Sequence, residues 1–159
     1  MRELYSSKEV LELTGITPRQ LQCWDERGIV SPLHRGHRRL YSLDDVTTLT
    51  VICELRRRGF SLQRVRRVIR LLQREFSQSL AQTVSSGFRH HLLTDGQDVY
   101  VETSSRQIVD LLRNAKQPML AICLSDTVRQ VRADIRAIKK RSQSVFMTAA
   151  ATRRAQGSS

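Results

Sequence analysis

Two helix-start patterns follow each other near the N-terminus, and they constrain the fold of this chain more than any other feature. Ser6 stands three residues before Glu9, and Thr17 stands three residues before Gln20. In such a capping box the hydroxyl and the later side chain each accept a hydrogen bond from the other residue's backbone. Gly15 lies between the two boxes and suits the left-handed end of a helix. We therefore predict two short helices joined by a tight turn, a helix-turn-helix.

The second helix of this pair has one apolar face and one polar face. Leu21 and Trp24 lie three residues apart, so we expect both in the core rather than at a ligand. The polar side chains near its start face elsewhere. Glutamine can pair with adenine and arginine with guanine, so the candidate DNA contacts here are Thr17, Arg19, Gln20 and Gln22. Arg19 suits a base or a phosphate, and Gln20 has the alternative role of completing its capping box.

A short hairpin is expected directly after this helix. Residues 33–41 contain two extended pieces around a turn near Arg35 and Gly36. A cationic hairpin in this place can lie along the phosphate backbone as a wing while the helix enters the major groove. Its candidate contacts are Arg35, His37, Arg38, Arg39 and Tyr41. The alternative is a surface hairpin whose charges are only solvated.

Two more helices follow the hairpin. Ser42 caps the first, with acidic residues in its opening turn, and Ser61 caps the second. Apolar residues recur at helical spacing in both, which predicts one buried face on each. Between them stands the run Arg56 to Arg58, in which we expect one arginine, Arg58, to reach a distal phosphate and the others to remain solvated.

The charge of the chain favours a polyanionic partner, either nucleic acid or an anionic membrane surface. Lysine and arginine number 27 against 15 acidic residues, a net charge of +12. The alternative is a basic protein without a specific ligand. No run approaches the roughly 18 apolar residues of a membrane span, and the first ten residues lack the apolar core of a secretion signal. Three scattered cysteines argue against a disulfide framework. We therefore expect a cytoplasmic, nucleoid-associated protein.

The first part of the chain strongly resembles the MerR family, the mercury-resistance-type regulators. The resemblance covers residues 4–72 and includes both helix pairs and the wing. The matching features occur in order along the sequence: Tyr5-Ser6, Glu9-Val10, Thr14-Gly15, Pro18-Arg19-Gln20-Leu21, Arg27-Gly28-Ile29, Ser31-Pro32, Arg39-Leu40-Tyr41-Ser42, Asp45 and Arg58-Gly59-Phe60-Ser61-Leu62.

The resemblance implies a homodimer that binds a pseudo-palindromic operator, with the second helix of each protomer in a major groove. It points most firmly to Arg39 and Tyr41 as wing contacts. The chain departs from the family at Cys23, where an aromatic residue is usual, and at Asp25, where glutamate is more frequent. The paired thiolates of the metal-sensing members are absent, so we expect neither a metal nor another cofactor.

Residues 73–91 are predicted to form a dimerisation helix. Apolar side chains recur there every four residues, at Phe76, Leu80, Val84 and Phe88. In the family, the helix after the second helix-turn-helix pairs with the same helix of the other protomer. The alternative is that this stripe packs within its own chain.

The sequence changes character at residue 92, and residues 92–140 are predicted to form a small α+β region. Residues 92–101 favour a hairpin around Asp95-Gly96. Residues 106–113 suit either a strand or a helix, 119–124 suit a buried strand, and a last helix begins near Ser125. Residues 141–159 are expected to be a basic flexible tail. The α+β region can add dimer contacts or bind an effector or partner protein.

The fold class expected is therefore mainly α: a winged helix-turn-helix over 1–72, a dimerisation helix over 73–91 and a small α+β region. The function expected is transcriptional regulation through double-stranded DNA, with RNA polymerase and a small effector as further candidate partners. Two alternatives stay open: a phage-excisionase-like or architectural DNA-binding protein, and a protein-interaction module of the antitoxin or chaperone-modulator type. An enzyme is not expected, because no nucleophile, histidine and carboxylate stand at a recognisable spacing and no phosphate-binding glycine loop occurs.

Overall fold

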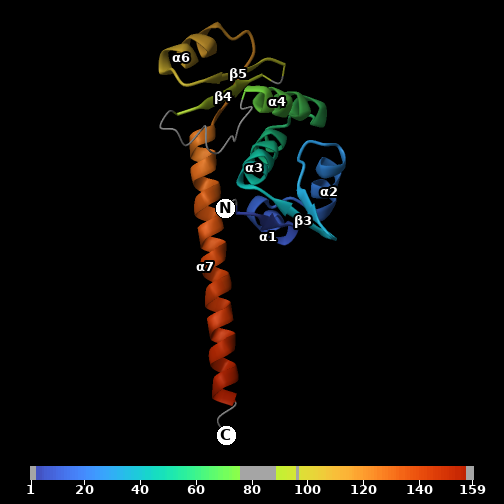
Figure 1. The fold of residues 1–159 in the computed structure, drawn as a ribbon. Coiled ribbons are helices and arrows are strands. Elements are labelled where there is room, and N and C mark those ends of the chain that lie inside the picture. Colours follow the sequence, from blue (N-terminus) through green and yellow to red (C-terminus); the bar gives the residue numbers. More distant parts are fainter. Residues whose placement is uncertain (1–2, 76–88, 96, 157–159) are drawn as a thin grey trace.

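The computed structural model describes residues 3–75, 89–95 and 97–156. Figure 1 shows a helical domain beside the upper part of one long helix, with a small sheet above both. The elements of the helical domain are β1 (Tyr5–Ser6), α1 (Ser7–Thr14), α2 (Pro18–Glu26), β2 (Leu33–Arg35), β3 (Arg38–Tyr41), α3 (Leu43–Arg57) and α4 (Leu62–Glu75). The elements that follow are β4 (His91–Thr94), β5 (Val99–Glu102), α6 (Ser105–Asn114), β6 (Leu120–Cys123) and α7 (Leu124–Gln156).

Both predicted capping boxes are confirmed. The Ser6 hydroxyl accepts from the backbone N–H of Glu9 (3.3 Å), and the Glu9 carboxylate accepts from the backbone N–H of Ser6 (3.2 Å). The same exchange joins Thr17 and Gln20 at the start of α2, at 3.2 and 3.0 Å. Gly15 has a φ of 73°, a left-handed conformation that costs glycine little, so the chain can turn sharply between α1 and α2.

The predicted hairpin is present, and a third strand joins it. β2 and β3 pair antiparallel, and β1 pairs with the other edge of β3, with Tyr5 opposite Tyr41. Since β1 has only two residues, it carries no alternation that a sequence pattern could reveal. This pairing anchors one strand of the wing to the start of the chain, while β2 remains at the edge of the sheet.

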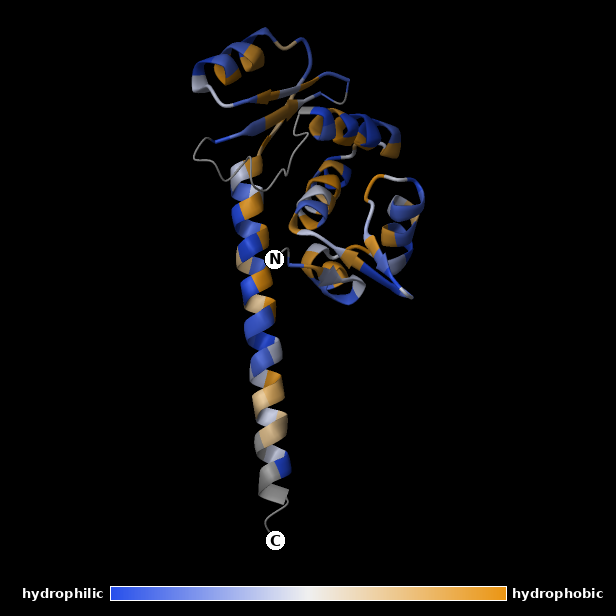
Figure 2. Cartoon of the chain, in the orientation of Figure 1, coloured by the Kyte–Doolittle hydropathy of each residue, from blue (hydrophilic) through white to orange (hydrophobic). Residues whose placement is uncertain are grey.

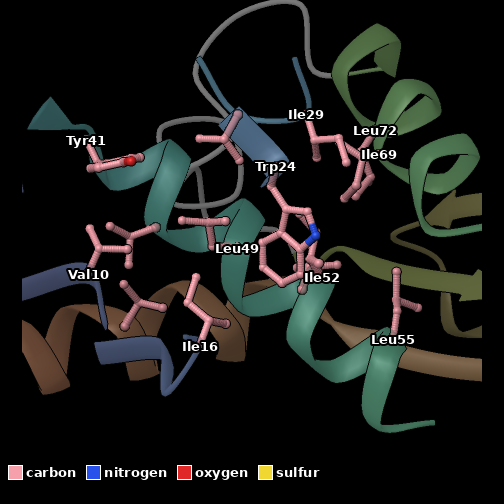
Figure 3. Close-up of a cluster of buried hydrophobic side chains, with 14 of the residues drawn as sticks. Val10, Ile16, Trp24, Ile29, Tyr41, Leu49, Ile52, Leu55, Ile69 and Leu72 are labelled. Carbon is pink, nitrogen blue, oxygen red and sulfur yellow. The ribbon is translucent and has the colours of Figure 1, made fainter. Parts of the chain in front are cut away.

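The core lies between the helices of the helical domain. Trp24 is buried, as expected, and Figure 3 shows its ring above Ile52 of α3 and near Ile29. The predicted apolar faces of α3 and α4 are also confirmed. Their buried residues include Val46, Leu49, Ile52 and Leu55 in α3, and Val65, Val68, Ile69 and Leu72 in α4. Cys53 is half-buried at the edge of this core.

The α+β character of the C-terminal region is confirmed in the residues that the structure describes. β4 pairs with β5 on one side and β6 on the other, giving the strand order β5-β4-β6. The ambiguous segment 106–113 is helical, because Ser104 caps α6 by accepting from the backbone of Gln107. The strand expected over 119–124 forms, but as an edge strand whose residues are half-buried or exposed rather than fully buried.

Helix α7 joins the two parts of the molecule. Val128, Val131, Ile135 and Ile138 are buried, and α7 lies against α1 and α3 of the helical domain. Near its start, Leu124 is buried in the same apolar cluster as Leu92 of β4 and Leu49 of α3. The helical domain, the sheet and the first half of α7 therefore share one continuous core.

Two expected boundaries are wrong. Residues 89 and 90 are not helical and His91 begins β4, so the helix expected over 73–91 does not extend to residue 91. The four residues expected in the dimer contact, Phe76, Leu80, Val84 and Phe88, lie outside the described residues.

The flexible tail expected over 141–159 is helical as far as Gln156. No glycine or proline interrupts the sequence from 119 to 156, and alanines 149–151 favour the helix. Among the helices described, none has both the length and the apolar character needed to cross a membrane.

We expect Leu49→Ala to lower the free energy of unfolding by about 2–5 kcal/mol, because the change leaves a cavity at the centre of the core. Leu33, which is 50% exposed on β2, is the matched control; Leu33→Ala should cost no more than about 0.5 kcal/mol. Urea unfolding of both variants measures the difference. Equal losses would show that Leu49 is not a centre of the core.

Candidate nucleic-acid interface

Helix α2 presents a polar face to solvent because its apolar face is anchored. Leu21 and Trp24 are buried, whereas Arg19, Gln20 and Gln22 are exposed. The side-chain oxygen of Gln20 accepts from the backbone N–H of Thr17, so this side chain already helps to hold the start of the helix. The Gln22 amide donates to the Glu26 carboxylate (2.9 Å), a contact between exposed side chains that a ligand can replace. Arg19 and Gln22 are therefore the available side chains on this face.

The tip of the wing is cationic and exposed. Arg35 and Arg38 are direct partners across the β2–β3 pair, and His37 lies in the turn between them. All three side chains are exposed. Gly36 makes the turn with a φ of 61°. The two arginines at adjacent positions favour an anionic surface as partner.

Arg39 has a different role from the rest of the wing. Its Nε lies 3.1 Å from Oδ2 of Asp25, and the side chains are only 34% and 13% exposed. This ion pair joins β3 to α2. Arg39 therefore fixes the angle between the wing and the helix, and one of its donors is already in use.

The expectation that Tyr41 contacts a ligand is wrong for this structure. Tyr41 is fully buried in the core, next to the segment that begins α3 (Figure 3). Successive side chains of a strand point to opposite faces, so the outward position of Arg38 places Tyr41 inside. Burial raises the pKa of the Tyr41 hydroxyl.

The arginines at the end of α3 are exposed, and each already makes a hydrogen bond or ion pair. Arg58 Nε lies 3.2 Å from Glu54 Oε1, and Arg57 reaches the same carboxylate at 4.0 Å. Arg56 donates to the carbonyl oxygen of Phe60 (2.9 Å). Arg58 is at the surface, as a phosphate contact requires, and that role stays a prediction.

The comparison with protein families agrees with this geometry. Residues 5–72 match the family described as MerR HTH family regulatory protein. We refer to residues 5–72, which are similar to this family, as the MerR domain. It extends from β1 to the last buried residue of α4, so the family match and the packed helical domain coincide.

Several curated proteins are similar to the chain beyond the MerR domain. An HTH-type transcriptional regulator of Mycobacterium tuberculosis, Rv1830, is 32% identical over 132 residues, which are 80% of this chain and 55% of the relative. Mb1861 of Mycobacterium bovis, also named an HTH-type transcriptional regulator, has the same figures. GlnR of Bacillus cereus, an HTH-type transcriptional regulator, is 34% identical over 61 residues, 38% of this chain and 47% of GlnR. The chain thus spans about half the length of the mycobacterial relatives.

A cationic face of helix α4, near the end of α2, was not predicted from the sequence. Helix α4 carries arginines that line a groove of about 690 Å³ beside the turn between β4 and β5: Arg64, Arg66, Arg67, Arg70 and Arg74. The apolar face of this helix was predicted from the sequence, whereas its charged face was not. The five arginines within eleven residues of the sequence are the signal that could have predicted this cationic face.

The described residues contain no group of three histidine, cysteine or acidic side chains close enough to hold a metal ion. Cys23, Cys53 and Cys123 are free and half-buried. Burial is the main cause that raises the pKa of the Cys53 thiol, which favours its neutral form. Cys23, one of the departures from the family pattern, packs against the core of the MerR domain.

The pair between Arg39 and Asp25 can be measured by a double-mutant cycle. Arg39→Ala, Asp25→Ala and the double variant should show a coupling free energy on the order of 1 kcal/mol in urea unfolding, because both side chains are partly shielded from water. The exposed pair of Arg58 and Glu54 is the matched control and should couple by about 0.5 kcal/mol or less. A coupling no larger than the control's would contradict the role given to Arg39.

Proposed function

We propose that this chain is a sequence-specific DNA-binding transcriptional regulator. In this proposal α2 enters a major groove and the wing follows the adjoining phosphate backbone. One observation carries it: the anchoring of Leu21 and Trp24 leaves Arg19 and Gln22 exposed, and the ion pair of Asp25 and Arg39 joins that helix to the cationic wing. Recognition of a duplex requires one element that contacts base edges in the groove and another that contacts the phosphate backbone, at a fixed relative orientation.

The side chains of α2 divide into two tasks. Gln22, one turn into the helix, contacts a base edge, where its amide can both donate and accept. Arg19 lies in the first turn, where the helix dipole is positive, and contacts a phosphate or a guanine. Thr17 and Gln20 hold the start of the helix in shape through their capping box, so they position the contacts of their neighbours.

The wing supplies contacts that do not depend on sequence. Arg35, His37 and Arg38 are exposed around its turn and neutralise phosphates of the flanking backbone. Arg39 holds the wing at its angle to α2 through Asp25. Arg58, at the start of the turn between α3 and α4, supplies a further phosphate contact.

We further propose that the chain forms a homodimer through the lower half of α7. Each protomer of this dimer binds one half of a pseudo-palindromic operator. Leu124, Val128, Val131, Ile135 and Ile138 follow one another at alternating steps of four and three residues, the spacing of a coiled-coil seam. Continued, this spacing reaches Ser142, Val145, Ala149 and Thr152.

This lower half extends past the helical domain in Figure 1, and Figure 2 shows a second apolar stretch within it. Val145, Phe146 and Met147 are 70%, 76% and 72% exposed. Most helical stability in proteins comes from packing of an apolar face, so a second copy that covers these exposed apolar residues stabilises the helix.

Binding to the operator tests the division of labour between α2 and the wing. Gln22→Ala should cost about 1–3 kcal/mol on the preferred operator and relax the preference at one base pair. Arg38→Ala should weaken binding about equally on all sequences and reduce the dependence of log K on log salt by about one unit. Operators selected from random duplexes, followed by salt titrations, give both measurements.

Arg113→Ala, which removes an exposed charge from α6, is the control and should change neither quantity. Absence of all duplex binding at low salt would reject the proposed function in favour of a protein-interaction module. A uniform loss for Gln22→Ala would assign that residue to the backbone.

Sedimentation equilibrium tests the dimer. Val145→Glu should raise the dimer dissociation constant by about tenfold or more, because it introduces a charge into an apolar contact. Gln143→Glu adds the same charge to the opposite face of α7 and should leave the constant within about a factor of two. Equal effects of the two variants, or a wild-type monomer, would contradict the seam.

A further inference from the structure

The groove beside α4 is lined mainly by arginines and lies outside the proposed DNA contacts. Its walls are one face of α4 and Gln97 in the turn between β4 and β5. The lining side chains are Ser61, Gln63, Arg64, Arg66, Arg67, Arg70, Leu71, Arg74 and Gln97. Five of these nine are arginines, and one is apolar. The volume of about 690 Å³ lies within the range of small-molecule sites, roughly 300–1,000 Å³.

The groove arginines have no ion-pair partner among the described residues, although other arginines of the chain do. Arg39, Arg58 and Arg89 each pair with a carboxylate. Two acidic residues, Asp95 and Asp98, lie in the same turn as Gln97. Asp95 accepts hydrogen bonds from the backbone N–H groups of Gln97 and Asp98, both at 2.8 Å. These bonds, with a smaller contribution from Arg64, lower the pKa of Asp95.

Like charges four residues apart on a helix repel each other, and α4 has two such pairs, Arg66 with Arg70 and Arg70 with Arg74. The repulsion opposes folding of α4 and is relieved when an anion lies between the guanidinium groups. An anion that relieves several pairs at once must itself carry several charges.

We propose that this groove binds a small polyanion with at least two phosphate groups. Arginine presents paired N–H donors that match the oxygen atoms of a phosphate, which explains the choice of arginine over lysine. Ser61, Gln63 and Gln97 add neutral donors around the rim. None of the described residues that line the groove is aromatic, so the phosphate groups, and not a stacked ring, supply the affinity. The hollow between α4 and Gln97 suits a compact ligand better than a duplex.

The position of Arg66 links this groove to the proposed DNA-binding helix. Its Nη2 lies 3.5 Å from the carbonyl oxygen of Arg27, the residue that ends α2. A polyanion in the groove draws Arg66 toward itself and weakens this contact. Weakening of this contact would let the ligand regulate DNA binding, and this regulation rests on the proposed function. Binding of the ligand to the groove does not depend on the proposed function.

Calorimetric titration of the full chain with inorganic tripolyphosphate, in the absence of DNA and at fixed salt, tests the site. The wild-type protein should bind at one site per chain. The double variant Arg67→Ala with Arg70→Ala should bind at least about tenfold more weakly, since it removes two charge-assisted donors. Arg106→Ala with Arg113→Ala removes the same charge from exposed α6 and should remain within about twofold of wild type.

Three outcomes would overturn the proposal. Tripolyphosphate that does not bind the wild-type protein would exclude a phosphate site. Equal weakening in both double variants would show attraction by net charge alone. Unchanged tripolyphosphate binding in the groove variant, together with weaker duplex binding, would assign these arginines to DNA. Circular dichroism confirms that each variant is folded, and because the titration contains no DNA, its result is independent of the proposed function.

Discussion

The packing of Leu21 and Trp24 against the core decides which face of α2 is available to a ligand. A helix of nine residues has little stability of its own, so its orientation depends on this burial. Figure 3 shows that the surroundings of Trp24 come from α3, α4 and the segment after α2. The outward position of Arg19 and Gln22 is thus a consequence of contacts made by several elements, and each of these elements contributes indirectly to the proposed recognition.

The wing depends on a second constraint, which is electrostatic. The carboxylate of Asp25 and the guanidinium of Arg39 lie at 3.1 Å between α2 and β3, while β1 pairs with the same strand through Tyr5 and Tyr41. This ion pair holds the helix and the strand together. Arg39 and Tyr41 are therefore not alike, although both are predicted from the sequence as wing contacts. Arg39 fixes the angle between the wing and α2, and Tyr41 belongs to the core.

Local chemistry explains what the sequence could predict. The capping boxes at Ser6, Thr17 and Ser42 need only residues three apart, and the apolar faces need only helical spacing. Burial of Tyr41 depends on a partner strand 36 positions away in the chain, which leaves no local pattern. The sequence shows the arginines of α4 but not the groove, because the second wall comes from Gln97 in the turn between β4 and β5. Tertiary contacts account for both misses.

Residues of the C-terminal region are part of the core on which the helical domain depends. Leu92 and Leu124 are buried in the same cluster as Leu49, and Val131 and Ile135 of α7 complete it. Since interiors pack tightly, a shift of the turn between β4 and β5 changes the environment of α4, and α4 contacts the end of α2 through Arg66. The proposed ligand groove lies at this junction. A ligand there thus acts on the same packed unit that orients Gln22, and no hinge between separate domains is needed to connect them.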